Sequence, residues 1–421
     1  MSAFLKHYGQ TLALLTGIVA GGACGLLLPG AVPYVRPVGE LFINLIFVLV
    51  VPLVFFSVAL AVLRMHRSGL LGKVMSRTLL VFLGMSVVAA VLALCAVAVG
   101  KPLDGSASQL LSGASAPGAD NSGGSLGEAL VQALSVPDFP MLFSKEHLLA
   151  LIVFAALLGC GPALAGEKGE RVARALEAGS EVTGKMMELL MYAAPVGLGC
   201  WFAGTLAGIG TGLMGGYLRI LVIYLVLSAL VFTLVNSLYV LLARGEGGMK
   251  AFWKHLWPAA MTAVATASSA VAMPAAIRCV RDAGVRDGIA EAVIPLGTNI
   301  HKNGSVMAAV CKIVFLTLLF SRPAGGGAFV AMVIGLALLE AMVLGAVPSG
   351  GFTGEIFLCS VLGFPPEAVG IIVVIGTLVD IPATLLNVQG NMVAAVLVDA
   401  LTGGQRKDRR PSIQGNGCGR P

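Results

Sequence analysis

The sequence predicts an all-α integral membrane protein with eight transmembrane helices and two re-entrant helical hairpins. The first observation is composition: 57% of the 421 residues are hydrophobic, 11% are charged, and the mean hydropathy is +0.93. A soluble domain carries about 25% charged residues. The second observation is a set of long runs without a charge. The third is a pair of apolar segments that small polar residues interrupt, and we assign the hairpins to these segments.

The long apolar runs define the predicted spans. A helix needs about 20 apolar residues to cross the hydrocarbon core, whereas a transmembrane strand has about 10 with alternating polarity, a pattern this chain lacks. The first run exceeds the roughly 7–15 residues of a signal-peptide core, so it is predicted to be the first span. The runs that reach helical length without a charge are Thr11–Val35, Leu41–Leu63, Thr78–Gly100, Leu189–Leu218 and Ile220–Ala243.

Basic residues gather after the second, fourth and sixth predicted spans and in the C-terminal tail. Such loops mark the cytoplasmic side, so both termini are predicted to be cytoplasmic. The basic residues form no continuous face, which argues against nucleic acid as a partner. They are Arg64, Arg67, Lys73, Arg77, Lys168, Arg171, Arg174, Arg244, Lys250, Lys254, Arg406, Lys407, Arg409 and Arg410.

Two apolar segments are interrupted near their middle. Leu256–Ile277 contains VATASSAVAMP and has basic loops on both sides, and Gly325–Leu362 contains AVPSGGFTGE. A full span would put the two basic loops on opposite faces, whereas a re-entrant hairpin keeps them together. Non-helical backbone at membrane depth is tolerated only where it is buried in protein or lines a cavity. Paired broken segments of this kind are typical of the midplane binding site of a secondary transporter.

The last predicted span carries a polar stripe. Asp380, Thr384, Asn387 and Asn391 are spaced by four, three and four residues, so they share one face of a helix. A buried aspartate there needs a cation, and the sequence leaves open a substrate ammonium, a metal ion, a proton or a lysine. A purely structural role between helices is the further alternative.

Small polar residues at the two hairpin tips are the next candidates for a binding site. The hydroxyls of Ser268 and Ser269 and the free N–H groups of a half-helix end can bind a carboxylate, or these small residues simply pack between helices. Ser349 and Gly350 break the second segment, either as a lid or as an ordinary turn. Glu355 just beyond is a functional candidate at this depth, unless it pairs with a lysine or lies near the headgroups.

The stretch LGTNIHKNGSVM interrupts an apolar segment with three consecutive polar residues. Asn303 and Gly304 break the helix there and expose carbonyl groups. Lys302 brings a positive charge near the predicted site. His301 is a residue type that titrates near neutral pH, although a lone histidine is more often a hydrogen-bonded core residue.

These motifs together resemble the dicarboxylate/amino acid:cation symporter family, which includes glutamate transporters. The resemblance covers nearly the whole chain and rests on MYAAPVGLGCWFAGTLA, SSAVAMP, IPLGTNIHKNGSVM, VPSGGF and NVQGNMVAAVLVD, in that order. It implies a homotrimer in which a transport domain moves like an elevator against a scaffold, with the hairpins as gates. The implied boundaries are 1–77 for scaffold helices 1 and 2, 78–100 for transport-domain helix 3, 101–218 for an extracellular loop and scaffold helices 4 and 5, 219–400 for the transport core of helix 6, hairpin 1, helix 7, hairpin 2 and helix 8, and 401–421 for a disordered cytoplasmic tail.

The resemblance also implies roles for individual residues. Asp380 matches the aspartate that holds the substrate amino group, and Asn387 matches the asparagine on the α-carboxylate. Ser268 and Ser269 match two positions of a serine motif, and Thr384 lies beside the side-chain subsite. An arginine that holds a distal carboxylate in acidic-substrate members is replaced by Ala383, and its alternative position by Ala267. A neutral amino acid is therefore favoured, unless Lys302 takes the role of the arginine.

The family's sodium sites are where this chain departs most. His301, Lys302 and Asn303 stand at a motif whose asparagine and aspartate serve sodium, and Asn391 stands at another sodium aspartate. Of the third-span ligands only Ser86 is left, because Phe82 and Met85 replace a tyrosine and a threonine. A hard cation prefers several oxygens with carboxylate charge, so Lys302 is interpreted as replacing an ion. Asn391 resembles proton-driven branches, and one sodium ion at a site of backbone carbonyls remains open.

The sequence therefore predicts a symporter that moves a small amino acid, with a neutral one favoured, or a dicarboxylate across the inner membrane of a bacterium. Coupling to protons, or to sodium at fewer sites, is expected. The partners are a small-molecule substrate and the lipid bilayer, and the eight cysteines form no zinc-like spacing, so no cofactor is predicted. The alternatives are an uncoupled exchanger or facilitator of the same fold and, as a different class, an ion channel. No catalytic constellation predicts an enzyme.

Overall fold

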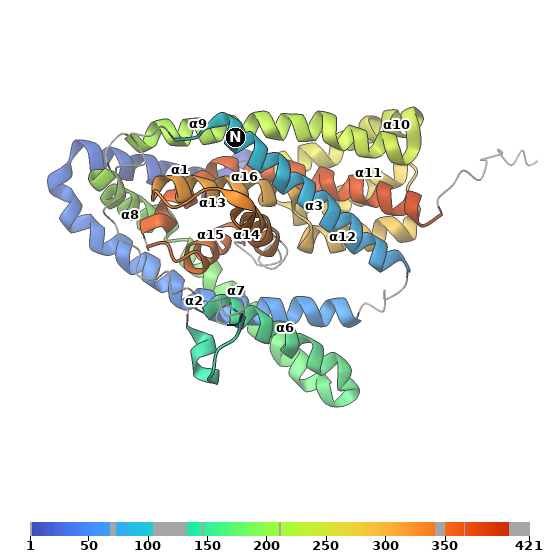
Figure 1. Cartoon of the computed structure of the whole chain (residues 1–421), viewed down its shortest axis with the longest axis horizontal. Helices are drawn as coiled ribbons and strands as arrows, with labels where there is room; N and C mark the ends of the chain where they lie inside the picture. Colours follow the sequence, from blue (N-terminus) through green and yellow to red (C-terminus); the bar gives the residue numbers. More distant parts are fainter. Residues whose placement is uncertain are drawn as a thin grey trace, which may run out of the picture.

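The computed structural model describes residues 2–67, 73–103, 131, 134–144, 147–209, 212–341, 350–365 and 367–403. All regular secondary structure in these ranges is helical, and Figure 1 shows the helices as one elongated bundle. The segments between and beyond these ranges, among them most of the predicted extracellular loop and the tail after residue 403, lie outside the described residues. The α-helices are α1 (Ser2–Leu27), α2 (Val32–Arg67), α3 (Lys73–Gly100), α6 (Leu148–Leu164), α7 (Glu170–Met191), α8 (Ala194–Ile209), α9 (Gly212–Leu230), α10 (Asn236–Thr266), α11 (Ser269–Asp282), α12 (Asp287–Ile300), α13 (Asn303–Leu319), α14 (Gly326–Leu339), α15 (Gly350–Val361) and α16 (Glu367–Leu401).

Several of these helices are long and apolar enough to cross a membrane. Among the described residues, five helical stretches pass on length and hydropathy: Pro29–Arg64, Val74–Gly100, Met214–Thr266, Asp287–Leu319 and Ala368–Leu401. A sixth candidate is the pair of α7 and α8, which is bent by 62°. Shorter apolar helices lie within α1, α6 and α14. The chain is therefore a multi-pass membrane protein.

Two predicted spans differ from the helices that the structure shows. The run Thr11–Val35 is divided, since α1 ends at Leu27 and Pro29 opens a 3₁₀ turn before α2. The run Leu189–Leu218 is also divided, because Leu189 belongs to α7 and a turn separates α7 from α8. Pro195 favours this break, since proline lacks the N–H that a continuing helix would use. Counting charge-free residues measures apolarity but does not locate such breaks.

The helices pack in two groups. The first group contains α1, α2, α6, α7 and α8, and the second contains α3 and α10 to α16, with α9 touching α3, α13 and α16. Small residues bring α1 very close to α8: a Cβ on Gly17 or Gly21 would lie 2.1 Å or 2.0 Å from the carbonyl oxygens of Pro195 and Gly199. Such close backbone approach is how small residues stabilise helix contacts in membranes.

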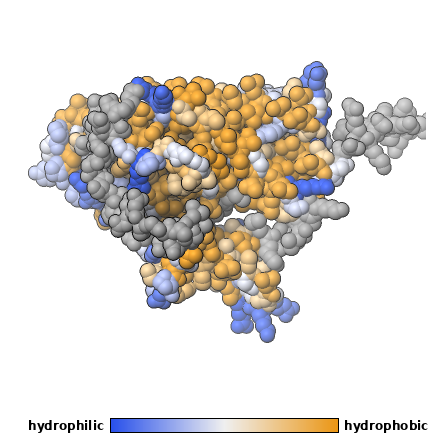
Figure 2. All heavy atoms as spheres, viewed as in Figure 1, coloured by the Kyte–Doolittle hydropathy of each residue, from blue (hydrophilic) through white to orange (hydrophobic). Residues whose placement is uncertain are grey.

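The surface of the bundle is strongly apolar. Figure 2 shows hydrophobic residues across most of the visible face, with hydrophilic residues gathered near its edges. Large exposed hydrophobic residues include Val48 on α2, Leu80 on α3 and Val226 on α9. Because lipid tails replace water as the solvent of such a surface, exposure of these side chains fits a membrane-embedded bundle.

The first interrupted segment forms a helical hairpin. The helix α10 breaks at Gly245, where φ is 68°, and runs on to a tight turn at Ala267 and Ser268 before α11. The two outer ends of this hairpin meet one carboxylate, that of Asp399 near the end of α16. Arg244 bonds Asp399 from the α10 side, and Arg286 bonds it from the α12 side with Nε 2.6 Å from Oδ1. Both flanking segments therefore lie at the same end of the bundle.

The two flanks of the second interrupted segment are also joined to each other, here near the opposite end of α16. Arg322, which precedes α14, donates to the carbonyl oxygens of Leu362 (2.5 Å) and Gly363 (2.6 Å), which follow α15. Its guanidinium also covers the ring of Phe364, 4.1 Å from the centroid. Since α16 has 35 residues, its ends lie about 50 Å apart at roughly 1.5 Å per residue. The flanks of the two interrupted segments therefore lie near opposite ends of α16.

The stretch of α12 and α13, which we call helix seven, is interrupted within the polar segment that predicts a break, but the break falls at His301 and Lys302, because Asn303 and Gly304 already form the first turn of α13. The helix α12 ends at Ile300 and α13 begins at Asn303, with His301 and Lys302 in extended or irregular conformation between them. The long helix α16 packs against both halves and passes this break without interruption, although it contains Pro382. The break and the polar stripe of α16 are therefore neighbours.

Candidate functional site

The break in helix seven is held by the polar stripe of α16. His301 is fully buried, and its Nδ1 lies 2.8 Å from Oδ1 of Asn391. The ring of Phe82 on α3 stacks on the His301 ring, with centroids 4.5 Å apart and an angle of 6° between the planes. A Cβ on Gly297 would lie 2.4 Å from Oδ1 of Asn391, so glycine is what lets this amide reach the histidine.

Asn387 anchors the first turn of α13. Its Oδ1 accepts hydrogen bonds from the backbone N–H of Gly304 (2.8 Å) and of Ser305 (3.3 Å), and its Nδ2 donates to the Ser305 hydroxyl at 3.2 Å. The hydroxyl of Tyr224 on α9 donates to the Gly304 carbonyl at 3.0 Å. The free N–H groups of a helix start are thereby satisfied from another helix. Because the amide oxygen is fixed, the second hydrogen on Nδ2 remains for an anionic group.

Ser86 and Asn303 form a second link into this cluster. The Ser86 hydroxyl donates to Oδ1 of Asn303 at 3.3 Å, and both side chains are buried. The cluster of Ser86, His301, Asn303 and Asn391 therefore consists of uncharged hydrogen-bonding groups and one imidazole. Within the described ranges, no three His, Cys, Asp or Glu side chains converge on a point that would suit a metal ion.

The acid and the base of the site lie near each other. Asp380 is exposed at the surface of the described residues, and its carboxylate has no hydrogen-bond or ion-pair partner among them. Lys302 is half-buried and lies within electrostatic range of Asp380. Thr384 and Ala383 are buried one turn further along α16. An exposed carboxylate without a protein partner is available to an ammonium group.

The hairpin tips are connected to this site less directly. The Ser268 hydroxyl accepts a 3.4 Å hydrogen bond from the N–H of Val271, so it caps α11, and Ala267 before it has a left-handed φ of 46°. The helix α11 packs on α12 and α16, yet neither Ser268 nor Ser269 hydrogen-bonds the polar stripe in the described part of the chain. Gly350 begins α15, and Ser349 lies outside the described residues.

Sequence reasoning missed two buried charges, Lys312 and Glu340, which lie beside Glu355. Glu355 pairs with a lysine, which is one of the alternatives that the sequence left open. That lysine is Lys312 on α13, whose Nζ lies 3.5 Å from Glu355 and 3.3 Å from Glu340. Lys312 and Glu340 are each the single charge in a long apolar stretch, VMAAVCKIVFLTLLF and AFVAMVIGLALLEAMVLGAV, and this isolation is the signal that would have found them.

A buried polar break, facing a polar helix stripe inside an apolar multi-pass bundle, defines a membrane transporter. The model of the sodium:dicarboxylate symporter family matches residues 11–401, and the chain belongs to this family. It is a transporter and not an enzyme.

The chain is also similar over most of its length to relatives that are named as glutamate or C4-dicarboxylate transporters. The chain is 25% identical over 405 residues to the proton/sodium-glutamate symport protein of Bacillus subtilis, covering 94% of this chain and 93% of that one. It is 24% identical over 391 residues to the C4-dicarboxylate transport protein of the same organism, covering 92% of both chains. It is 26% identical over 400 residues to the C4-dicarboxylate transport protein of Rhizobium etli, covering 94% of this chain and 89% of that one.

Proposed function

We propose that this protein is a secondary active symporter that carries a small amino acid, with a neutral one favoured, or a dicarboxylate across the cytoplasmic membrane. The observation that carries the proposal is the carboxylate of Asp380, which has no hydrogen-bond or ion-pair partner among the described residues and is exposed near the break in helix seven. In this position Asp380 binds the ammonium group of the substrate, and Nδ2 of Asn387 donates to the carboxylate. Ser268, Ser269, Ser349, Gly350, Ala383 and Thr384 complete the proposed binding surface.

The environment of Ala383 supports a neutral substrate. A Cβ on Gly304 would lie 2.3 Å from the Ala383 carbonyl oxygen, so α13 and α16 touch backbone to backbone here. No long basic side chain stands at this position to hold a second carboxylate. Lys302 is the nearby cation that would serve an acidic substrate instead. The names of the relatives, which carry glutamate and C4-dicarboxylates, keep both substrate classes open for measurement.

The uncharged cluster supports coupling to protons, or to sodium at fewer sites. Ser86 bonds Asn303 and His301 contacts Asn391, so these four side chains present amide, hydroxyl and imidazole groups instead of carboxylate oxygens to a cation. Hard cations prefer such oxygens. Lys302 supplies a fixed charge where an ion would otherwise bind. A sodium site built from backbone carbonyls of the second hairpin and helix seven is the remaining place for a metal ion.

The packing supports a scaffold and a moving transport domain. The helices α1, α2, α6, α7 and α8 form the proposed scaffold, and α3 with α10 to α16 forms the proposed transport domain. Hairpin ends at opposite ends of α16 fit two re-entrant gates and eight spans. Basic residues favour the cytoplasmic side, so Arg244 and Arg286 support a proposed cytoplasmic location of the Asp399 end in a bacterium. We also propose a homotrimer with elevator motion, because the resemblance to the family implies both.

Reconstituted transport tests the proposal. Purified protein in proteoliposomes should exchange labelled substrate with unlabelled substrate inside, which a channel does not do. Imposed sodium and proton gradients then separate the rivals: a symporter accumulates substrate with one of them, whereas an exchanger or facilitator ignores both. A prior thermal-shift screen of amino acids and C4 acids, with and without sodium, chooses the substrate.

The variant Asp380→Asn tests the site itself. Loss of a charge-assisted hydrogen bond costs about 1.5–3 kcal/mol, which lowers affinity for an amino acid roughly 10- to 150-fold. The exposed Asp138→Asn is the matched control and should bind as the wild type does. Unchanged affinity in Asp380→Asn would reject the ammonium role.

A further inference from the structure

Three charged side chains that the proposed substrate site does not use meet in the core of the bundle. Lys312 on α13 lies between Glu340, which follows α14, and Glu355 on α15. Each of the three side chains is at least nine-tenths buried, with relative exposures of 3%, 5% and 3%. We refer to Lys312, Glu340 and Glu355 as the buried triad. It joins both arms of the second hairpin to helix seven.

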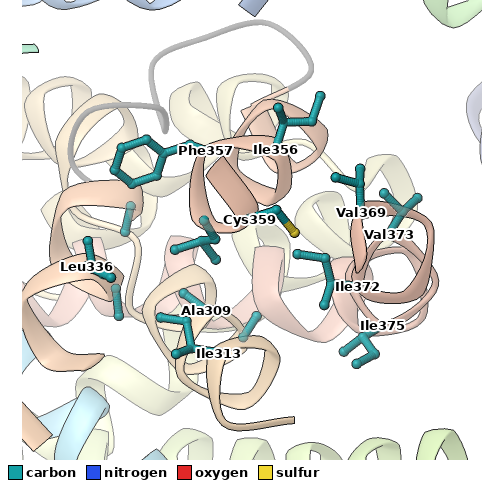
Figure 3. Close-up of a cluster of buried hydrophobic side chains, with 14 of the residues drawn as sticks. Ala309, Ile313, Leu336, Ile356, Phe357, Cys359, Val369, Ile372, Val373 and Ile375 are labelled. Carbon is teal, nitrogen blue, oxygen red and sulfur yellow. The ribbon is translucent and has the colours of Figure 1, made fainter. Parts of the chain in front are cut away.

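The surroundings of the triad are apolar. Figure 3 shows the side chains of Ala309 and Ile313, which flank Lys312 on α13, in one cluster with Leu336 of α14 and Cys359 of α15. Isoleucines and valines of α16 close the cluster from another side. A charge in such surroundings is costly unless it is paired and hydrogen-bonded.

Two glycines make room for the carboxylates. A Cβ on Gly354 of α15 would lie 2.4 Å from Oε1 of Glu340. A Cβ on Gly376 of α16 would lie 1.8 Å from Oε1 of Glu355. Any other residue at these positions would displace a carboxylate. The triad is therefore a site shaped by its neighbours, with both acids placed against backbone that a side chain would otherwise cover.

The charges of the triad do not balance. One lysine faces two carboxylates, so the fully ionised triad carries one excess negative charge. Oε2 of Glu340 is buried and has no hydrogen-bond partner among the described residues. An unpartnered carboxylate oxygen in an apolar interior is expensive, and it becomes favourable when it carries a proton.

Other titratable groups near the triad leave the same excess. Lys302 lies within electrostatic range of Glu340, and Asp380 lies within range of Lys312 and Glu355. The thiols of Cys311 and Cys359 and the phenol of Tyr224 are neutral neighbours. Two lysines and three acids, when ionised, sum to one negative charge. A zwitterionic amino acid adds none, so one further positive charge is needed for neutrality.

We propose that the Glu340–Glu355 pair of the buried triad is the site that binds the coupling proton, one proton for each amino acid carried. The inference rests on the proposed function, because it needs a substrate that travels with the proton. Binding forms one O–H bond on a carboxylate, with the proton taken from water on one side of the membrane. Release breaks that bond and returns the proton to water on the other side.

The position of the site explains how the proton is linked to movement. Glu340 and Glu355 belong to the two arms of the second hairpin, and Lys312 belongs to helix seven. With the proton bound, the triad is neutral and the arms pack in the apolar cluster. Without it, the excess negative charge favours an arrangement in which water reaches the carboxylates. Packing of the two arms against helix seven is thereby favoured when the proton is present.

Proteoliposomes loaded with a pH-sensitive dye test this site. With the membrane potential clamped to zero, a gradient of one pH unit should accumulate substrate about tenfold in the wild type, since one proton across one pH unit is worth about 1.4 kcal/mol. Substrate added outside should acidify the interior. In Glu340→Gln and Glu355→Gln, accumulation should fall at least fivefold relative to exchange, and substrate-driven acidification should disappear. Glu188→Gln is the control, because Glu188 is an exposed acid that pairs with Lys185 on α7.

The outcomes separate this inference from the proposed function. If the wild type exchanges substrate but neither accumulates it with a pH gradient nor acidifies the interior, the proton site is wrong and the transporter stands. If both glutamine variants keep the wild-type accumulation, the proton binds elsewhere. If the wild type does not exchange any amino acid or C4 acid, the proposed function is wrong, and the inference that rests on it is wrong as well. A negative result in the two wild-type measurements refutes the proton site even if a variant does not fold.

Discussion

Gly304 is the residue whose substitution tests the geometry of the site most directly. It lies in the first turn of α13, where its N–H donates to Asn387 and its carbonyl accepts from Tyr224. A Cβ at this position would lie 2.3 Å from the Ala383 carbonyl oxygen and 2.7 Å from the Ala383 Cα. Ordinary contacts begin at about 3.5 Å, so α13 and α16 must separate by about 1 Å in Gly304→Ala.

This separation should weaken substrate binding. A shift of about 1 Å lengthens the hydrogen bond from Gly304 to Asn387, which is 2.8 Å long, beyond useful range. Overpacking of this kind costs about 1–3 kcal/mol. If the cost falls on the arrangement that binds substrate, affinity decreases roughly 5- to 150-fold. Substrate-dependent thermal shift of the purified protein in detergent measures the affinity.

A second glycine-to-alanine variant separates the clash from the change in helix propensity. Gly84 lies within α3, and no atom comes within 4 Å of the position that its Cβ would take. Gly84→Ala should bind substrate normally and be equally or slightly more stable, by up to about 1 kcal/mol. Equal affinities of Gly304→Ala, Gly84→Ala and the wild type would refute the reasoning, because the contact of α13 with α16 would then not shape the site.

Three further variants have outcomes that follow from single contacts. Lys302→Met should change the ion or pH dependence of uptake in proteoliposomes, and wild-type dependence would make Lys302 structural. Asp399→Asn removes the buried carboxylate that Arg244 and Arg286 share, and should lower the free energy of unfolding by about 1–3 kcal/mol, measured by thermal unfolding in detergent; an unchanged transition would contradict the role of this pair. Tyr224→Phe leaves the carbonyl at the start of α13 without its donor and should cost about 0.5–1.5 kcal/mol in the same assay, whereas a stabilised variant would exclude the bond.

The sequence predicts helix identity and the polar stripe well, because both depend on periodicity along one helix. Asp380, Asn387 and Asn391 are spaced to share a face of α16. In the structure, Asn391 contacts His301 and Asn387 accepts a hydrogen bond from Gly304, so both amides reach the break in helix seven. The polar stretch also predicts a break, but at Asn303 and Gly304, whereas the structure has it at His301 and Lys302. Whether the hairpin tips complete the binding site stays a prediction, since Ser349 lies outside the described residues.

Pairings between distant helices are beyond what a single sequence predicts. Arg244 and Arg286 were predicted to share the cytoplasmic side, but their common partner Asp399 is more than a hundred residues away from either. The sequence around Lys312 does not predict that Glu340 and Glu355 are its neighbours, because these residues belong to other segments of the chain. Contacts of this kind are set by helix packing, which depends on the whole chain.

The placement of the acids shows how this chain differs electrostatically from the family pattern it resembles. At positions 303 and 391, where that pattern has aspartates for sodium, this chain has amides that bond Ser86 and His301 and carry no charge. Its buried carboxylates lie instead at Glu340 and Glu355, around Lys312. A buried lysine can neutralise only one of two acids, so the second acid requires a mobile cation. A hard cation needs several oxygen ligands, and among the described residues no three His, Cys, Asp or Glu side chains converge on one point, whereas a proton needs only one oxygen. Charge balance therefore favours a proton as the mobile cation of this second group of acids.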